Sequence, residues 1–414
     1  MSSTLARRLR LPDAVAIGLG SMIGAGVFVV FAPASEAAGA WLLAGLVIAA
    51  FVAYCNATSS AQLAAVHPVA GGTYAYGRAE LGAWWGYVAG WGFVIGKTAS
   101  AAAMALTFAA YVAPGWEKPL AAAAVAALAG LNLLGVTRTA LATKIIVVLV
   151  IGALAVVAVA GVAAGPAGQA ADAGAPAGVY GVLQSAGLMF FAFAGYARIA
   201  TMGEEVVDPA RTIPRAIVVA LAGAVAVYAV VAVAVLVALG PSGAAGSAAP
   251  LADVVAAAGW DAAGPVVRVG AALASLGALL ALLAGLGRTS LAMAREGDLP
   301  RALAAVSATR RVPHHAEIAI AAAVIVVVLV GDVRGAIGFS SFGVLMYYFV
   351  ANVAAHRQGP AVRRYPRALQ VAGAIGCVVL VATLPWQSIA IGLAVTAIGV
   401  ALRVARLVAE RRAL

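Results

Sequence analysis

The stretch GLGSMIGAGVF, residues 18–28, places four glycines inside an apolar segment about as long as one membrane span. A glycine in a helix interior costs about 1 kcal/mol relative to alanine, so this segment is a weak helix. Either close packing of a neighbouring helix or a break in the helix at a binding site can account for the glycines. The spacing from Gly20 to Gly24 fits the G-x-x-x-G packing motif. Taken alone, this stretch therefore favours packing.

The composition of the whole chain places it in a membrane. Of its 414 residues, 64% are hydrophobic and only 10% are charged, whereas a soluble domain carries about a quarter charged residues. Residues 145–171, 216–252 and 368–402 contain no Asp, Glu, Lys or Arg, and each stretch is longer than the roughly 20 residues that cross a bilayer. The sequence predicts an all-α integral membrane protein with one transmembrane domain over residues 1–414.

Turn residues and charges divide the chain into about twelve predicted spans. We place them near residues 13–38, 41–66, 82–113, 120–137, 140–163, 180–204, 213–239, 266–291, 315–331, 335–356, 368–385 and 387–406. The segments 164–178 and 240–254 are rich in Gly, Ala and Pro, and we predict that both are flexible outer loops.

The positive charges predict the orientation. With twelve spans and the N-terminus inside, 20 of the 26 lysines and arginines fall on the inner side, as the positive-inside rule requires. Both termini are therefore predicted to be cytoplasmic. The net charge of +11 reflects this topology and is not a nucleic-acid-binding surface. The excess of arginine over lysine fits a GC-rich bacterial genome, which predicts a location in the bacterial inner membrane.

The sequence carries no signal for an enzyme, a cofactor or a metal site. No Asp or Glu falls in the middle of a predicted span, and the four histidines lie in inner loops or at span ends. An intramembrane hydrolase or zinc enzyme needs such groups at its reacting centre. The sequence around Lys97 looks like a phosphate-binding loop, but Trp91 stands where that motif needs its first glycine. We expect no catalysis, no cofactor and no metal.

A second interruption changes the interpretation of the first. FFAFAGYAR, residues 190–198, places Gly195 inside the sixth predicted span. The two interruptions lie five spans apart, in spans 1 and 6, so they occupy corresponding positions in two halves of the chain. Paired breaks of this kind are typical of transporters built from inverted repeats, with the binding site at the breaks.

Taken together, the motifs resemble the amino acid–polyamine–organocation (APC) superfamily. The resemblance rests on GSMIGAGVF (20–28), FFAFAGYARIATMGEEVVDPARTIPRA (190–216), RTSLAMAREGDLP (288–300), LNLLGVTRTALATK (131–144) and FSSFGVLMYY (339–348). It covers essentially the whole chain. It implies a five-plus-five inverted repeat of the LeuT type, in which spans 1 and 6 are discontinuous. The first repeat would cover about residues 13–163 and the second about 180–356, followed by two additional spans at about 368–406.

The resemblance also implies a substrate site at the two breaks. The amides of residues 24–26 would face the substrate carboxylate, because a helix N-terminus offers unpaired donors. The carbonyls of Met22, Phe191 and Ala194 would accept from the α-ammonium group. The full set of predicted substrate-binding residues is Met22, Ile23, Gly24, Ala25, Gly26, Phe191, Phe193, Ala194 and Gly195.

Lys144 has two interpretations. It follows Arg138 by six residues, or about 9 Å along a helix, and by itself this spacing favours an ammonium group that reaches the inner surface. The resemblance instead implies that a fifth-span lysine replaces a sodium ion and bridges spans 1 and 8. In that case Ser275 is the candidate partner in span 8.

Lys97 and Arg198 are predicted to set the charge selectivity. Lys97 lies roughly 22 Å from either end of its span, so it must face a partner or a wet cavity. It can serve structure alone if carbonyl groups satisfy it. Members of the superfamily often have an acidic residue where this chain has Ala197, followed here by Arg198. That departure argues against proton coupling through the missing carboxylate, and Glu204 and Glu205 are candidate partners of Arg198.

The sequence therefore predicts a sodium-independent secondary transporter of amino acids that works by alternating access, as an exchanger or a proton-coupled symporter. We expect neutral substrates first and acidic ones second. The alternatives are a polyamine or cationic amino acid transporter of the same superfamily, and a channel or receptor-like binding protein. The expected partners are a small-molecule amino acid, membrane lipid and protons, with no nucleic acid. The oligomeric state stays open.

Overall fold

The computed structural model describes residues 9–67, 71–135, 140–166, 178–200, 202, 205–307, 310 and 312–412. This part of the chain is almost entirely helical. Its one extended pairing is an isolated bridge between Leu9 and Val206. The prediction of an all-α protein is confirmed.

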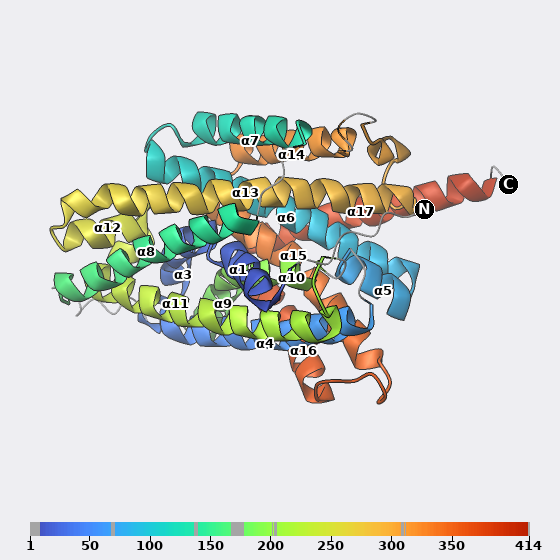
Figure 1. Cartoon of the computed structure of the whole chain (residues 1–414), viewed down its shortest axis with the longest axis horizontal. Coiled ribbons are helices and arrows are strands. Elements are labelled where there is room, and N and C mark those ends of the chain that lie inside the picture. The colour runs from blue at the N-terminus through green and yellow to red at the C-terminus, as the bar shows by residue number, and fades with distance from the viewer. Residues whose placement is uncertain are drawn as a thin grey trace.

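Most helices run along the long axis of the molecule (Figure 1). Their bounds are α1 Leu11–Met22, α2 Ala25–Val29, α3 Phe31–Ala38, η1 Gly39–Trp41, α4 Leu42–Val66, α5 Thr73–Leu81, α6 Ala83–Val112, α7 Glu117–Leu133, α8 Ala140–Ala164, α9 Val179–Phe193, η2 Ala194–Tyr196, α10 Ala197–Ala200, α11 Pro209–Gly246, α12 Pro250–Ala257, η3 Asp261–Ala263, α13 Gly264–Arg295, η4 Arg301–Ala304, α14 His314–Val330, α15 Val333–Arg357, α16 Arg367–Thr383 and α17 Trp386–Arg412.

Nine segments of the described chain are long and apolar enough to cross a membrane. Each predicted span overlaps a helix or a group of consecutive helices. Three of these helices, α7, α14 and α16, have 17 residues each. A helix of that length covers about 25 Å, slightly less than the hydrocarbon core. The protein is a multi-pass membrane protein, and twelve spans stay a prediction.

Helix α6 is the most buried of the nine candidate membrane-spanning segments in the described part of the chain. It packs against α13 and α15, and glycines explain how closely it approaches α15. A Cβ atom added at Gly96 would lie 3.0 Å from the Ser340 carbonyl oxygen, and one added at Gly343 would lie 2.6 Å from the Gly92 carbonyl oxygen. Only a pair of helices without side chains at these points can pack backbone against backbone.

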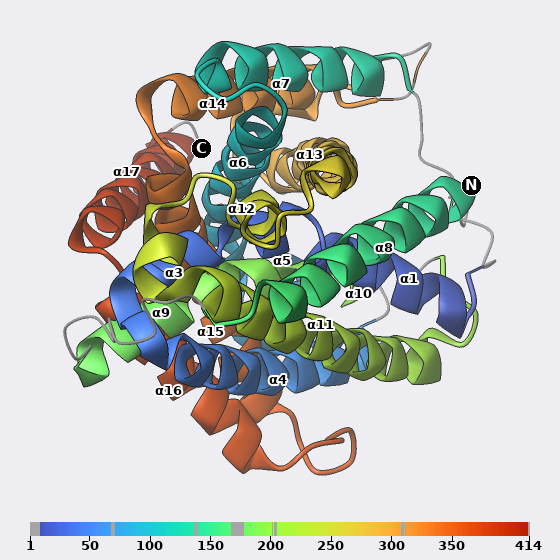
Figure 2. The same cartoon turned by 90° about the vertical axis from the view of Figure 1, so that its left-hand side faces the viewer.

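Helices α7 and α14 pack as a pair on one side, and α4 lies with α16 on the opposite side (Figures 1 and 2). Helices α1, α9 and α10 of the two interrupted segments lie between these two pairs (Figures 1 and 2). Many outward-facing side chains on α4, α8, α16 and α17 are apolar and exposed, as expected for a surface in contact with lipid.

One predicted loop is wrong. Residues 240–254 are not a flexible connection, because α11 continues past a kink at Gly240 to Gly246 and α12 begins at Pro250. Leu251 and Val254 of this segment are fully buried. Small residues and prolines, which are typical of loops, here form a packed helical corner. Most of the other predicted loop, residues 167–177, lies outside the described residues.

Candidate functional site

The first helix stops and restarts within the glycine-rich stretch. Helix α1 ends at Met22, where the amide of Ile23 donates to the Leu19 carbonyl at 2.7 Å. Helix α2 begins at Ala25. In the described part of the chain, the amides of Gly24, Ala25 and Gly26 have no hydrogen-bond acceptor outside their own helix. The predicted carboxylate-binding donors are therefore unoccupied by other protein groups.

The helical geometry also changes within the sixth predicted span. Helix α9 ends at Phe193, a 3-10 turn covers Ala194–Tyr196, and α10 begins at Ala197. The amide of Ala194 donates to the Phe191 carbonyl as the helix tightens. Phe191, one of the three predicted acceptors, thus already accepts one hydrogen bond from the protein.

The two interruptions touch each other through glycines. A Cβ atom at Gly195 would lie 2.3 Å from the Ser21 carbonyl oxygen, and one at Gly26 would lie 2.8 Å from the Cα of Ala192. Gly24 faces the side chain of Ala278 on α13, at 2.9 Å from an added Cβ. Close packing, the alternative that we considered for residues 18–28, is present here. It exists together with the break and does not replace it.

Tyr228 of α11 connects the two interruptions. Its hydroxyl group lies 2.5 Å from the Met22 carbonyl oxygen and 2.9 Å from the Ala192 carbonyl oxygen, close enough to donate to either. The ring is buried and packs against Phe193 with 5.0 Å between the ring centroids. Met22, another predicted acceptor, is therefore held by a residue that the sequence analysis missed.

Lys97 lies at the second interruption. Its side chain is 7% exposed, and Nζ donates to the Ala194 carbonyl oxygen at 3.2 Å. The hydroxyl of Tyr348 approaches the same oxygen at 3.4 Å. The ammonium group of a protein side chain thus occupies the place that we predicted for the α-ammonium group of a substrate. A carbonyl oxygen has two lone pairs and can accept a second donor.

The predicted bridge from Lys144 to span 8 is not formed. Lys144 Nζ lies 2.6 Å from Asp13 Oδ1, and its side chain is 44% exposed. Ser275 is fully buried on α13, and its hydroxyl group has no hydrogen-bond partner among the described residues. Lys144 lies in the second turn of α8 and Asp13 in the first turn of α1. The pair therefore forms near helix ends, which agrees with the interpretation that spacing alone favoured.

Arg198 lies on α10 and is partly buried. Glu205 and Arg288 are the charged groups that interact with it electrostatically, whereas Glu204, its other predicted partner, lies outside the described residues. In the part of the chain that is described, no three His, Cys, Asp or Glu side chains gather so that they could hold a metal ion.

One signal in the sequence could have identified Tyr228. It is the only side chain with a polar group between Arg215 and Pro241, a stretch otherwise made of Ala, Val, Ile, Leu and Gly. Tyrosine hydroxyls that are buried in an apolar surrounding usually have a hydrogen-bond partner. Carbonyls freed by a broken helix are such partners.

The similarity to known proteins extends over nearly the whole chain. A family model described as "Amino acid permease" matches residues 13–409. An uncharacterized transporter of Mycobacterium tuberculosis is 56% identical over 410 residues, which cover 99% of this chain and 93% of the relative. The branched-chain amino acid permease of Bacillus subtilis is 25% identical over 335 residues, or 75% of this chain and 72% of the relative. Cationic amino acid transporter 3, mitochondrial, of Arabidopsis thaliana is 29% identical over 376 residues, or 84% and 62%. The match to the family includes both interruptions.

Proposed function

Since the chain belongs to the amino acid permease family of membrane transporters, we propose that it moves neutral amino acids across the bacterial inner membrane by alternating access. Acidic amino acids are the second substrate class in this proposal. Transport is sodium-independent and proceeds as exchange or as proton symport. The mycobacterial relatives support the bacterial membrane.

The position of Lys97 carries the proposal of a neutral substrate. Its ammonium group is buried and lies 3.2 Å from the Ala194 carbonyl oxygen, at the interruption of the sixth predicted span. No Asp or Glu lies in the middle of a predicted span. A substrate with a cationic side chain would place a second positive charge near Lys97 without a carboxylate to pair it, and an unpaired buried charge costs several kcal/mol.

The interruptions offer complementary groups to the backbone of an amino acid. In this proposal the free amides of Gly24, Ala25 and Gly26 bind the carboxylate. The α-ammonium group binds the carbonyl oxygens of the second interruption, where it displaces Lys97 from the Ala194 oxygen, and the carboxylate of the same substrate molecule balances its charge. One zwitterion then satisfies donors on α2 and acceptors at the end of α9.

The names of the relatives favour two different substrate classes. The Bacillus subtilis relative is called a branched-chain amino acid permease, which agrees with a neutral substrate. Relatives from Arabidopsis thaliana and Homo sapiens are called cationic amino acid transporters, at 27% to 29% identity. A cationic amino acid transporter is therefore the second candidate function.

Uptake into proteoliposomes separates these candidates. Purified protein is reconstituted, and uptake of a panel of labelled neutral, acidic and basic amino acids is measured with and without an unlabelled internal pool. We expect concentrative uptake or exchange of neutral amino acids, with weak uptake of arginine, lysine and putrescine. Preferred uptake of arginine or putrescine would instead establish the cationic alternative. Dissipative flux without saturation would indicate a channel.

The ion dependence needs its own measurement. Lys144 pairs with Asp13 and not with Ser275, its expected partner in a site where the lysine replaces a sodium ion. External sodium is replaced by choline at constant ionic strength, and in a separate series the pH gradient is collapsed with a protonophore. We expect no effect of choline. Loss of concentrative uptake with the protonophore indicates proton symport, and unchanged counterflow indicates exchange.

A further inference from the structure

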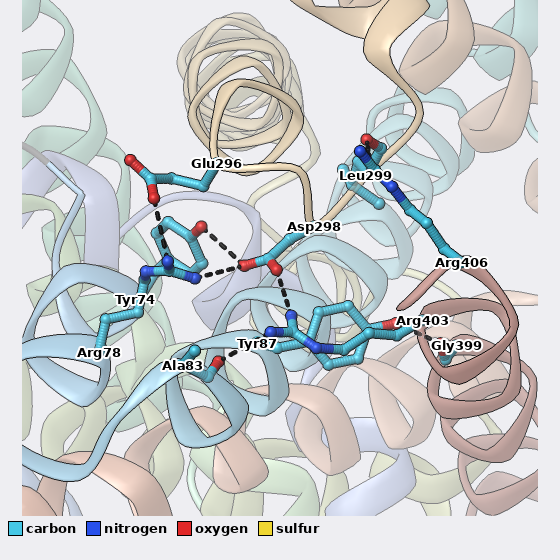
Figure 3. Close-up of polar contacts among 10 residues, drawn as sticks. All are labelled: Tyr74, Arg78, Ala83, Tyr87, Glu296, Asp298, Leu299, Gly399, Arg403 and Arg406. Carbon is cyan, nitrogen blue, oxygen red and sulfur yellow. Dashed lines mark hydrogen bonds and ion pairs between the residues drawn. The ribbon is translucent and has the colours of Figure 1, made fainter. Parts of the chain in front are cut away.

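A cluster of arginines lines a polar cavity that includes no residue of either interruption. The cavity has a volume of about 260 Å³ and lies where the C-terminal ends of α5 and α13 meet the C-terminal half of α17. Five arginines line it, and Figure 3 shows three of them with their contacts. They are Arg78, Arg295, Arg301, Arg403 and Arg406. We call this site the arginine pocket.

Two carboxylates also line the pocket, and they are already paired. Asp298 is 3% exposed at its side chain and forms ion pairs with Arg78 and Arg403. It also accepts a hydrogen bond from the hydroxyl of Tyr74 at 2.8 Å. Glu296 pairs with Arg78 at 3.0 Å. Figure 3 shows Asp298 between the two guanidinium groups. Among the described residues that line the pocket, arginines outnumber carboxylates by five to two.

Two arginines of the pocket have donors that are available to a ligand. Arg295 and Arg301 are exposed and form no hydrogen bond or ion pair with any described residue. Arg403 belongs to the fixed part of the pocket, because it is 8% exposed, pairs with Asp298 and has its guanidinium 4.5 Å from the ring centroid of Tyr87. The pocket is thus held in shape by Asp298 while part of its donor capacity is unused.

The surroundings of the pocket point to the kind of anion. Guanidinium groups bind phosphate through paired N–H donors, and a phosphate group fits several arginines at once. Helix α17 forms one wall with Arg403, Arg406 and Leu407. On its outer side α17 exposes apolar side chains, including Leu402 at 63% and Val408 at 44%. The guanidinium donors of the pocket therefore lie directly beside an exposed apolar surface of α17 that acyl chains can contact.

We propose that the arginine pocket binds the phosphate of an anionic phospholipid whose acyl chains lie along α17. The sequence predicts that this end of the molecule faces the cytoplasm, where basic pockets between membrane helices bind anionic head groups. The lipid stabilises the junction of α5, α13 and α17. A soluble phosphate offers the same head-group chemistry without the acyl chains, so the two sources can be separated by experiment.

The test uses the full-length protein in phosphatidylcholine bicelles. Thermal unfolding is followed while short-chain phosphatidylglycerol, short-chain phosphatidylcholine or inorganic phosphate is added at constant ionic strength. We expect a saturable rise in the unfolding temperature with phosphatidylglycerol and none with phosphatidylcholine. The absence of a saturable effect of phosphatidylglycerol on the unchanged protein overturns the proposal. A saturable effect of inorganic phosphate that equals that of phosphatidylglycerol overturns the lipid as the source.

A matched pair of variants locates the site. Arg295→Gln with Arg301→Gln removes two exposed charges from the pocket, and Arg357→Gln with Arg367→Gln removes two exposed arginines from α15 and α16 outside it. We expect the first pair to weaken phosphatidylglycerol binding on the order of tenfold and the second pair to leave it within about twofold. Equal weakening by both pairs shows general charge attraction and overturns the pocket as the site.

Discussion

Lys97 and Lys144 show that the position of a lysine within its helix decides its surroundings. Lys97 lies in the middle of α6, which is buried on almost all sides, and its ammonium group finds a carbonyl oxygen that a neighbouring interruption has exposed. Lys144 lies near the start of α8, where it is 44% exposed and pairs with Asp13. The distance of each lysine from the end of its helix predicts this difference from sequence alone. The resemblance to a family does not, because it implies a role for a lysine of the fifth span without specifying its turn of the helix.

The pairing of Lys144 with Asp13 predicts a small effect on stability. An ion pair this exposed contributes about 1 kcal/mol or less. We therefore expect Lys144→Ala and Asp13→Ala to lower the unfolding free energy by similar small amounts, and the double variant to lose little more than either single variant. The measurement is a double-mutant cycle by thermal unfolding in detergent. A strictly additive double variant would contradict the pairing.

At the scale of helices, the positions of the spans were predictable and the contacts between interruptions were not. Hydropathy along the sequence identifies apolar stretches that are long enough to cross a bilayer, so the predicted ranges overlap helices. The connection from Tyr228 to Met22 and Ala192 joins residues 206 and 36 positions apart, which no local pattern records. Helix α12 was missed because a short buried corner of small residues has the composition of a loop.

Tyr228→Phe tests the connection between the two interruptions. The variant keeps the ring and removes the hydroxyl group, which leaves the carbonyls of Met22 and Ala192 without this donor. We expect a loss of about 1–3 kcal/mol in unfolding free energy and weaker substrate binding. Tyr180→Phe is the matched control, because Tyr180 is 55% exposed on α9. Equal stability of the two variants would show that the Tyr228 hydroxyl group is dispensable.

Gly195→Ala tests the backbone contact between the same two segments. The added Cβ would lie 2.3 Å from the Ser21 carbonyl oxygen, so α1 and the 3-10 turn must separate. We expect a loss of about 1–3 kcal/mol in stability. Gly152→Ala on α8 is the control, because nothing lies within 4 Å of its added Cβ, and an alanine there raises helix propensity. Unchanged stability and binding in Gly195→Ala would contradict this contact.

At the scale of the whole molecule, the fold places two kinds of charge in two places. The buried ammonium group of Lys97 lies at the second interruption, and a cluster of arginines lies at one end of the bundle. The positive-inside rule predicts which side of the membrane that end faces. The orientation is set when the chain is inserted into the membrane, so the packing of the helices does not determine it.

Cysteine labelling in intact cells tests the predicted orientation. Both native cysteines, Cys55 and Cys377, are buried. We expect Trp116→Cys, in the predicted outer connection after α6, to react with a membrane-impermeant maleimide in intact cells. Gly359→Cys, in the predicted inner connection after α15, should react only after the cells are opened, and its Cβ meets no atom within 4 Å. The opposite pattern would place the arginine pocket on the outer side.

The effect of Lys97 on charge discrimination tests the proposed function most directly. In proteoliposomes, the inhibition constants of arginine and of the preferred neutral amino acid are measured for the unchanged protein and for Lys97→Met, which keeps the length of the side chain without its charge. We expect arginine to bind at least about 100-fold more weakly than the neutral substrate in the unchanged protein, because an unpaired buried charge costs several kcal/mol. In Lys97→Met this ratio should fall by about tenfold or more, since the repulsion is removed. An unchanged protein that binds arginine as tightly as any neutral amino acid would contradict the account.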